Sequence, residues 1–268
     1  MTKLIVFTDL HMTPEGTTII GLDPYQRLAA GIAHVNAHHS DADGVIFTGD
    51  LTHRADIVSY RRLKQLLGTL APPAMITIGN HDHRETFLGI FDDVAPDAGG
   101  FVQQVVDFPD CRVVVLDTLL APPYDYPASH AGHLCETRLA WLDRALAEAG
   151  ALPVLVFMHH PPHKTGFTGM DAIRLGNEHD FYDLVLRHGN VRHIFAGHVH
   201  RTIGGSHRGI PFSIFKSPVH QQPMPFDTPN PSLAVDEPGA YGIVVVTEDG
   251  LQVHTEDFEI ARRDSDIA

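Results

Sequence analysis

Five short polar clusters each follow directly on an apolar run in this chain of 268 residues. The clusters are Asp9-Leu10-His11, Gly49-Asp50, Gly79-Asn80-His81-Asp82, His159-His160 and Gly197-His198-Val199-His200. Together they offer carboxylate and amide oxygens and imidazole nitrogens, but no thiolate. Such donors suit Mn, Fe, Zn or Co better than they suit a structural zinc cage. The residue types therefore indicate metal-dependent chemistry.

The candidate donors are too numerous for a single ion that keeps one position open. They are Asp9, His11, Asp50, Asn80, His159, His198 and His200. Two ions that share one bridging carboxylate would use all of them. In Asp9-x-His11 and His198-x-His200, side chains two apart lie on one face of an extended segment, so each pair can address one or two neighbouring ions. We therefore expect a centre of two metal ions.

The clusters can meet only if the fold brings the preceding apolar runs together. We expect those runs to be strands, at residues 3–8, 44–48, 74–78, 153–158 and 191–196. Continuous apolar runs of this length are typical of strands that are buried on both faces. Each cluster then stands at the C-terminal end of a strand, which is the edge at which open α/β sheets bind ligands.

Helical patterns alternate with these strands. Asp23-Pro24 offers a cap and a first-turn proline for a helix that carries Leu28, Ile32 and Val35 at helical spacing. Further helices are expected at residues 55–70, 84–91, 136–149 and 180–188, and an antiparallel strand pair at residues 101–108 and 112–117. The alternation predicts an α/β layered sandwich with two sheets in one domain, residues 1–258, followed by a polar tail at residues 259–268.

Three proline-containing stretches are too long to be simple connections. They span residues 119–132, 161–177 and 218–238. We expect them to wall a binding site or to form contacts in a homo-oligomer. Within the second stretch, Met170 is expected to be pocket wall or core and His163 to have a structural role, as is His160 just before it.

The composition narrows the choice of partner and compartment. The formal net charge of −14 at pH 7 disfavours a nucleic-acid polymer as substrate, because such a groove needs basic side chains. It is compatible with carboxylates that metal ions neutralise. No apolar run approaches the roughly 20 residues of a membrane span, so we expect no membrane association. The N-terminal residues are typical of a strand and not of a secretory leader, which favours a cytoplasmic protein.

The histidine and cysteine content bears on the kind of chemistry. The 20 histidines exceed the 19 lysines and arginines taken together, which favours metal binding or acid-base chemistry. Cys111 and Cys135 match no zinc spacing, and we expect both to be free thiols.

The ordered motifs D-x-H, G-D, G-N-H-D, H and G-H-x-H, which span residues 9–200, resemble those of the calcineurin-like metallophosphoesterase superfamily. The stretches "FMHHPP", "FAGHVH" and "SPVHQQP" are most similar to the bacterial class III phosphodiesterases, in the branch of glycerophosphodiesterases and cyclic nucleotide phosphodiesterases. The resemblance implies a four-layer α/β/β/α sandwich of two mixed sheets flanked by helices. It also implies hydrolysis of small phosphodiesters by a hydroxide that two metal ions activate.

The resemblance also implies a role for each motif residue. The first ion would be held by Asp9, His11, Asp50 and His200, and the second by Asp50, Asn80, His159 and His198. His81 would lie above the pair and contact the phosphate or protonate the leaving oxygen, and His220 would line the substrate pocket. Asp82 is expected to cap the following helix or to orient His81.

One position departs from the family pattern, and several functions stay open. Many relatives carry Asp or Asn three residues after the bridging aspartate, whereas this chain has His53. The motifs "GDLTHRA" and "GNHDH" also differ from those of protein Ser/Thr phosphatases. The alternatives to a general phosphodiesterase are a phosphodiesterase specific for 3',5'- or 2',3'-cyclic nucleotides, a phosphomonoesterase, a nuclease, and a catalytically silent scaffold.

Overall fold

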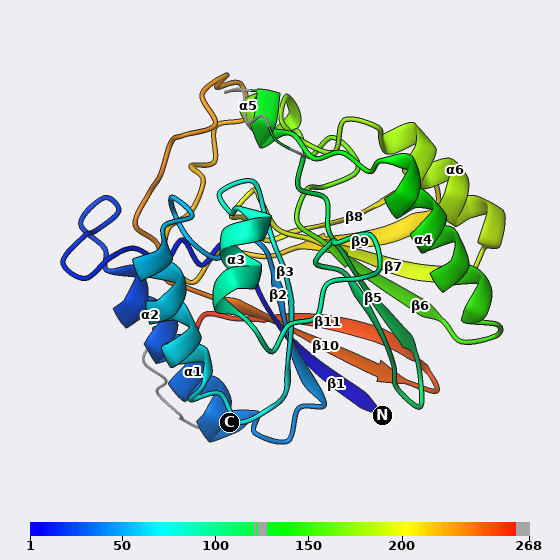
Figure 1. The fold of residues 1–268 in the computed structure, drawn as a ribbon, viewed down its shortest axis with the longest axis horizontal. Coiled ribbons are helices and arrows are strands. Elements are labelled where there is room, and N and C mark those ends of the chain that lie inside the picture. The colour runs from blue at the N-terminus through cyan, green and yellow to red at the C-terminus, as the bar shows by residue number, and fades with distance from the viewer. Residues whose placement is uncertain (121, 123–127, 261–268) are drawn as a thin grey trace, which may run out of the picture.

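The computed structural model describes residues 1–120, 122 and 128–260. Its first sheet has five strands in the order β11 (Gly250–Glu256), β10 (Tyr241–Thr247), β1 (Thr2–Phe7), β2 (Gly44–Thr48) and β3 (Ala74–Thr77). β1, β2 and β3 are parallel, whereas β10 pairs antiparallel with β1 and with β11. Both ends of the chain therefore contribute to one sheet (Figure 1).

The second sheet has six strands. Their order is β4 (Gln104–Asp107), β5 (Arg112–Leu116), β6 (Val154–Met158), β7 (Val191–Ala196), β9 (Ile210–Ile214) and β8 (Ile203–His207). The four central strands are parallel, and an antiparallel strand closes each edge. Both sheets are thus mixed, and the parallel strands of each sheet end on the same side of it.

Helices cover the outer faces of the two sheets (Figure 1). On the first sheet lie α1 (Pro24–His38), α2 (Ile57–Leu67) and α3 (Arg84–Ile90), and on the second lie α4 (Glu136–Glu148) and α6 (Glu178–His188). Asp23 caps α1 by accepting a hydrogen bond from the backbone N of Tyr25, with Pro24 in the first turn. The short helix α5 (Thr168–Asp171) and a 3-10 turn (Ala128–His130) lie in long connections.

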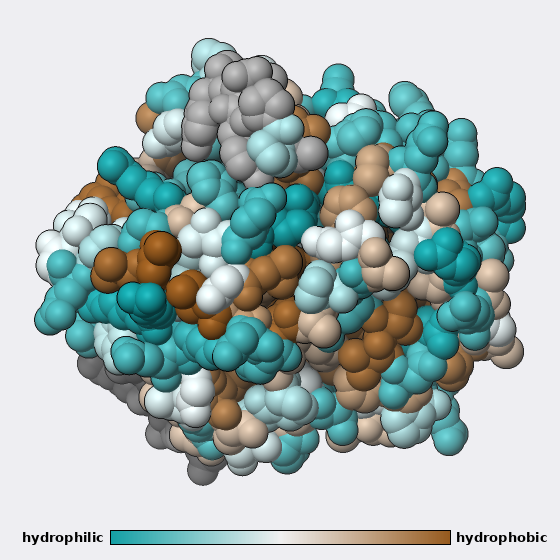
Figure 2. Space-filling model, viewed as in Figure 1, coloured by the Kyte–Doolittle hydropathy of each residue, from teal (hydrophilic) through white to brown (hydrophobic). Residues whose placement is uncertain are grey.

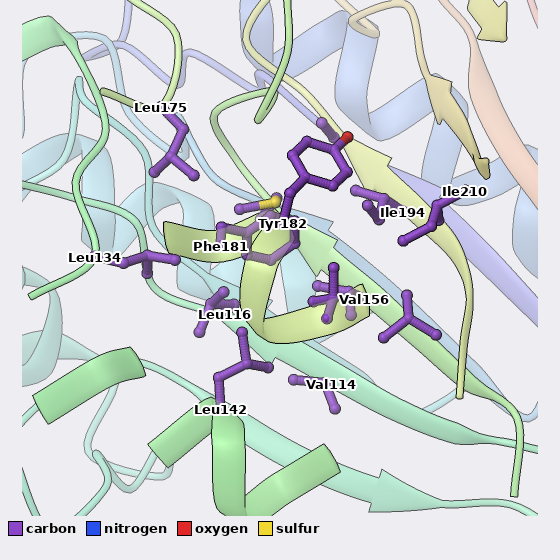
Figure 3. Packing of buried hydrophobic residues seen from close by; sticks show 14 of the residues in the cluster. Val114, Leu116, Leu134, Leu142, Val156, Leu175, Phe181, Tyr182, Ile194 and Ile210 are labelled. Carbon is purple, nitrogen blue, oxygen red and sulfur yellow. The ribbon is translucent and has the colours of Figure 1, made fainter. Parts of the chain in front are cut away.

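Three apolar layers hold these elements together. One lies between the two sheets and includes Val6, Phe157 and Phe195. The second joins the first sheet to α1, α2 and α3, and the third joins the second sheet to α4 and α6 (Figure 3). Complete burial of a side chain such as Phe157 contributes roughly 1.5–3 kcal/mol. The expected four-layer α/β/β/α sandwich is confirmed.

Most differences from the expected elements lie at their ends. α2 begins at Ile57 and not at residue 55, because Asp56 caps it through the backbone N of Ser59 while Ala55 has a φ of +53°. β4 is shorter than expected, and α5 was not expected at all. Within the described residues, no helix combines the length and apolarity needed to cross a bilayer. Most of the expected tail, residues 261–268, lies outside the described residues.

Candidate metal centre

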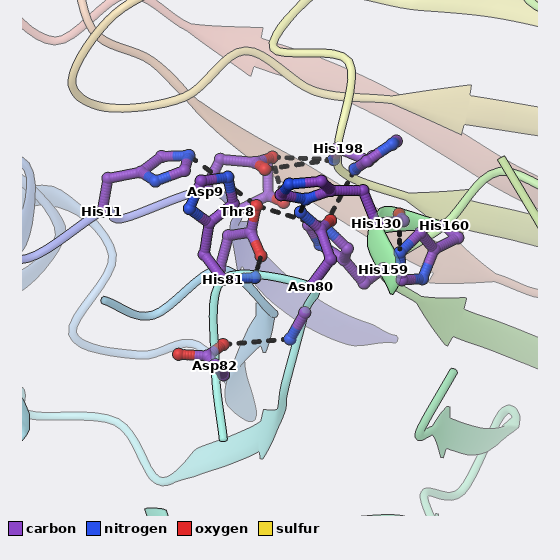
Figure 4. Close-up of polar contacts among 12 residues, drawn as sticks. Thr8, Asp9, His11, Asn80, His81, Asp82, His130, His159, His160 and His198 are labelled. Carbon is purple, nitrogen blue, oxygen red and sulfur yellow. Dashed lines mark hydrogen bonds and ion pairs between the residues drawn. The ribbon is translucent and has the colours of Figure 1, made fainter. Parts of the chain in front are cut away.

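The five polar clusters meet where the C-terminal ends of β1, β2, β3, β6 and β7 converge (Figure 4). Both sheets contribute, so the centre lies across the layer between them. Six of the predicted donors are buried: Asp9, His11, Asp50, His159, His198 and His200. Asn80 and His81 are partly exposed. The structure thus brings together all seven predicted donors, with His81 beside them.

Asp50 lies at the middle of this group. Its Oδ2 is 3.4 Å from Nε2 of His159 and 3.8 Å from Nε2 of His11, so one carboxylate faces donors on two sides. Its Oδ1 accepts a hydrogen bond of 2.8 Å from the backbone N of His81, which fixes the orientation of the carboxylate. This is the geometry that a shared ligand requires.

Backbone carbonyls set the direction of three imidazole rings. Nδ1 of His159 lies 2.9 Å from the carbonyl oxygen of Thr48, and Nδ1 of His200 lies 2.9 Å from that of His220. Each ring therefore donates from Nδ1 and turns its Nε2 toward a carboxylate, His159 toward Asp50 and His200 toward Asp9. Nδ1 of His81 lies 2.9 Å from the carbonyl oxygen of His53, and by the same reasoning its Nε2 is left for other partners.

The ring nitrogens inside the centre face one another at close range. Nε2 of His11 lies 3.1 Å from Nε2 of His200, and Nδ1 of His198 lies 3.2 Å from Nε2 of His159. When both nitrogens of a pair are unprotonated, their lone pairs cannot satisfy each other, whereas a cation between them can accept both. Donor atoms of Asp9, Asp50 and His159 also lie within 4.8 Å of one another. The residues present therefore fit divalent or trivalent metal ions.

The backbone at these residues is strained. Of the eight non-glycine residues with positive φ among those described, five are predicted donors: Asp9, His11, Asp50, His198 and His200. Such backbone conformations cost free energy and concentrate at functional sites. The expectation that Asp9-x-His11 and His198-x-His200 are extended is therefore wrong. Their side chains converge because the chain turns after β1 and β7, not because of strand periodicity.

Two motif glycines are required by close packing. A Cβ on Gly79 would lie 2.3 Å from Oδ1 of Asp50 and 2.8 Å from Nε2 of His159. A Cβ on Gly197 would lie 1.9 Å from Oγ1 of Thr8. Any larger residue at either position would displace a predicted donor or its support.

Asp82 joins two of the loops that carry donors. It accepts hydrogen bonds from the backbone N of Leu51 and Thr52 after β2, from the backbone N of Gly79 after β3, and from the hydroxyl of Tyr60 on α2. It does not cap the following helix, because α3 has His83 as its N-cap residue and no side-chain cap bond. Its role is to hold the Asp50 and Asn80 loops together.

The electrostatics of the centre also favour positive charge. Burial opposes ionisation of Asp50, yet the nearby imidazoles of His159 and His81 hold the pKa of this carboxyl well below its usual range. Burial alone would lower the pKa of His159, but the Asp50 carboxylate raises it to about 9. Likewise Asp9 outweighs burial and raises the pKa of His200. The two carboxylates thus attract cationic partners into a buried site.

A cavity of about 480 Å³ opens over the centre. Its inner part is lined by predicted residues, including Asp50, His81 and His220. The ring centroid of His220 lies 4.6 Å from that of His200, and its buried Nδ1 has no hydrogen-bond partner among the described residues. His220 therefore lies in the pocket, where the motif placed it.

Two histidines that the motifs did not assign also line the cavity. His53 stacks on His81 with ring centroids 5.5 Å apart, and its Nδ1 lies 3.4 Å from Nδ1 of His11. His130 lies in the 119–132 stretch, with its Nδ1 2.7 Å from Nδ2 of Asn80. The position of His53, three residues after Asp50, could have identified it. Nothing local marked His130, because only the tertiary fold brings it to Asn80.

His160 and His163 have structural contacts. Nδ1 of His160 lies 2.8 Å from Oγ1 of Thr118 and its Nε2 lies 3.0 Å from the carbonyl oxygen of His130, so both nitrogens have protein partners. His163 is buried away from the centre, with Nδ1 3.0 Å from the hydroxyl of Tyr182.

Comparison with known proteins identifies relatives over most of the chain. Residues 2–202 match the family of calcineurin-like phosphoesterases. The chain is 42% identical to a probable cyclic nucleotide phosphodiesterase of Rhodopseudomonas palustris, over 94% of this chain and 91% of that protein. It is 29% identical to the glycerophosphodiester phosphodiesterase GpdQ of Enterobacter lignolyticus, over 86% and 82% of the two chains. A 3',5'-cyclic adenosine monophosphate phosphodiesterase, CpdA of Pseudomonas aeruginosa, is 31% identical over 74% and 69%.

Solved structures share the fold at low sequence identity. A dimetal phosphatase from Danio rerio superposes with a TM-score of 0.67 at 16% identity, over 95% of this chain and 98% of that one. A purple acid phosphatase from yellow lupin has a TM-score of 0.64 at 13% identity, over 96% of this chain and 51% of that one. With the family match and the relatives above, we conclude that the chain belongs to the calcineurin-like phosphoesterases, in their bacterial class III phosphodiesterase branch.

Proposed function

We propose that this protein hydrolyses small phosphodiesters at a centre of two metal ions that share Asp50. The observation that carries the proposal is the position of Asp50, whose Oδ2 faces His159 on one side and His11 on the other. The side chains around it are oriented by backbone carbonyls and loop contacts, as a preformed ligand set requires.

Each ion has its own donors in this proposal. One set is Asp9, His11, Asp50 and His200, and the other is Asp50, Asn80, His159 and His198. The separation into two sets is supported by the close nitrogen pairs, because His11 and His200 approach each other on one side and His159 and His198 on the other. The donor chemistry fits Mn, Fe, Zn or Co.

When bound, two such ions neutralise the phosphoryl oxygens and lower the pKa of water so that it can attack at neutral pH. His81 lies above this set, between His11 and His130, with ring centroids 4.8 and 5.4 Å away. Because its Nδ1 faces the carbonyl oxygen of His53, its Nε2 is available to bind a phosphoryl oxygen or to donate a proton to the departing oxygen. His220 and Asn80, which also line the cavity, would contact the substrate.

A diester fits this cavity better than a monoester. The described residues that line it include no lysine or arginine, so an additional phosphate charge would have no cationic side chain to pair with. The named relatives act on cyclic nucleotides or glycerophosphodiesters, and esters of that size suit a cavity of about 480 Å³. The net charge of −14 disfavours a nucleic-acid polymer.

A turnover screen tests this proposal. Purified protein reconstituted with Mn, Fe, Zn or Co should hydrolyse bis-p-nitrophenyl phosphate faster than p-nitrophenyl phosphate, and should cleave cyclic nucleotides or glycerophosphodiesters. Metal analysis should give two ions per chain. Faster hydrolysis of the monoester would favour the phosphatase alternative. Failure to bind metal after reconstitution would favour the silent scaffold.

We also propose a single-domain homo-oligomer in the cytoplasm. The support for subunit contacts is the 218–238 stretch, in which the large side chains of Met224 and Phe226 are exposed. On the face seen in Figure 2, hydrophobic residues lie in separate groups among hydrophilic ones. The unpaired thiols of Cys111 and Cys135 fit a reducing compartment. A mass near 29 kDa by light scattering would contradict the oligomer, and cell fractionation tests the location.

A further inference from the structure

We infer that the outer half of the cavity is an apolar subsite for an aryl or nucleobase group of the ester, with Ile20 and Leu233 as its selective residues. This inference deepens the proposed function, on which it rests. The outer half is lined by three separate segments: Ile19 and Ile20, Met170 and Ile173, and residues 231–234. The side chains of these lining residues are all uncharged. The inner half, by contrast, is lined by histidines and by carboxyl or amide groups. The cavity therefore has a polar inner half and an apolar outer half.

Ile20 is held in the cavity wall by a strained turn. Its φ is +46° and that of Gly21 is +88°, and the backbone of Ile19 and Leu22 closes the turn with hydrogen bonds of 2.9 and 2.8 Å. A β-branched residue disfavours this left-handed conformation more than most. The side chain is also 53% exposed, so core packing does not explain it. Strain at an exposed apolar side chain that faces a cavity points to a ligand contact.

The wall formed by α5 and the 218–238 stretch is held by several hydrogen bonds and an ion pair. The backbone N of Thr168 and of Gly169 donate to the carbonyl oxygens of Phe226 and Thr228, at 2.9 and 3.0 Å, so α5 and the 218–238 stretch form one unit. In Figure 1 this stretch, in orange, arches toward α5. Arg201 anchors it with a two-pronged ion pair to Glu237 at 2.7 and 2.8 Å. Leu233, 40% exposed, is thereby held at the rim of the cavity.

The chemistry of this wall selects the ester group. A flat, uncharged ring can cover several aliphatic side chains at once, and Ser232 and Gln222 offer it hydrogen bonds. A choline or ethanolamine group would meet neither an aromatic cage nor a carboxylate among the described residues of the outer wall. We therefore expect a preference for esters that carry an aryl group or a base over glycerophosphodiesters with cationic heads.

A second turn of the protein offers a matched control for a variant at Ile20. Arg208 and Gly209 form a second turn with nearly the same backbone, with φ of +50° and +85°. This turn joins β8 to β9 and does not line the cavity. The variants Ile20→Gly and Arg208→Gly both relieve a left-handed residue. Arg208→Gly also removes an exposed ion pair with Asp183, which contributes little, so neither variant should lower the thermal midpoint markedly. A difference between them in ligand binding then reports the contact of Ile20 with the ligand.

The test compares two pairs of ligands. Bis-p-nitrophenyl phosphate and methyl p-nitrophenyl phosphate release the same phenolate but retain an aryl or a methyl ester. In Ile20→Gly, KM for the bis-aryl ester should rise about five- to tenfold more than KM for the methyl ester, as expected for loss of one aliphatic contact. Leu233→Ser should act in the same direction, and Arg208→Gly should leave the ratio of the two KM values unchanged.

Calorimetry of diphenyl phosphate and dimethyl phosphate on the metal-loaded protein gives a readout that needs no turnover. Wild-type protein should bind the diphenyl ester more tightly, and Ile20→Gly should reduce that preference. Equal affinities in wild-type protein, or equal losses for both ligands in the variant, would overturn the subsite. If neither nitrophenyl ester is hydrolysed but the binding preference is found, the proposed function fails and the apolar subsite stands.

Discussion

The inner and outer halves of the cavity are built by different means. The inner half consists of buried polar side chains at strand ends, held by backbone carbonyls and by Asp82. The outer half consists of uncharged side chains on connections, among them Ile20 and Leu233, which are partly exposed. The reactive groups lie at the ends of rigid strands. The residues proposed to select the substrate lie on loops, whose sequences can change without disturbing those strands.

Both halves contain backbone strained by a positive φ, but the strain has a different function in each. At Asp9, Asp50 and His198 a positive φ turns donors toward a common point. At Ile20 a positive φ presents an apolar side chain to the cavity mouth. If the two halves are independent, a substitution in one should leave the properties of the other unchanged.

The largest expected effect comes from Asp50→Ala. Activity should be lost and the metal content should fall to one ion or none, because Asp50 is the one carboxylate among the described residues whose Oδ2 faces both His11 and His159. Metal analysis and turnover of bis-p-nitrophenyl phosphate measure the two losses. Asp249→Ala, on an exposed turn, is the control. Two ions and full turnover in Asp50→Ala would remove Asp50 from the shared position.

His81→Ala should keep both ions and the fold while kcat falls by about 10² or more, the usual size of a lost proton donor. The deficit should be smaller for p-nitrophenyl esters, since a good leaving group needs no proton. Steady-state kinetics with a nitrophenyl and an alkyl leaving group separate the cases, with the exposed His254→Ala as control. Equal losses for both would assign His81 to phosphate positioning.

Asp82→Asn should weaken the inner half without touching a proposed ligand. All the partners of Asp82 are donors, so an amide would set its own N–H groups against some of them. We expect a loss of about 1–3 kcal/mol of unfolding free energy and a roughly 10- to 100-fold drop in metal affinity. Denaturant titration and metal competition measure both. Tyr60→Phe removes one of the hydrogen bonds to Asp82 and should therefore lower stability and metal affinity less than Asp82→Asn does. A larger loss in Tyr60→Phe would contradict the role of Asp82 in joining the two loops.

The smallest predicted effect concerns stability at low pH and depends on His163, a buried residue of the 161–177 stretch. Burial, with a further contribution from His207, lowers the pKa of His163 to about 4. Its stabilising contribution is complete above the unfolded pKa of about 6.5 and is lost as the pH falls toward 4, by about 2 kcal/mol at pH 5. Denaturant titrations at pH 7 and 5 should give a smaller difference for His163→Gln than for wild type. An unchanged difference would exclude His163 as a source of acid sensitivity.

The inner half was predictable because its signals are local. A polar cluster after an apolar run can be recognised without knowledge of the fold, and so Asp50 and His159 were assigned from sequence. The exact ends of helices were not predictable. A helix was expected from residue 55, for example, but α2 begins only after Asp56, which caps it. His130 and Ile20 were not identified, because the first reaches Asn80 only through tertiary packing and the second depends on a turn conformation that isoleucine disfavours.

The pairing of β1 with β10 has a consequence for how the centre forms. Residues 2–6 pair with residues 242–246, so the strand that ends at Asp9 and His11 is completed by nearly the last part of the chain. Contacts between residues so distant in sequence form slowly and late. A nascent chain that has emerged through residue 202 carries every proposed ligand, yet its β1 still has an open edge where β10 belongs. During synthesis the ligands therefore precede the sheet that holds them, and the exposed edge of β1 is a point at which a growing chain is open to wrong pairing.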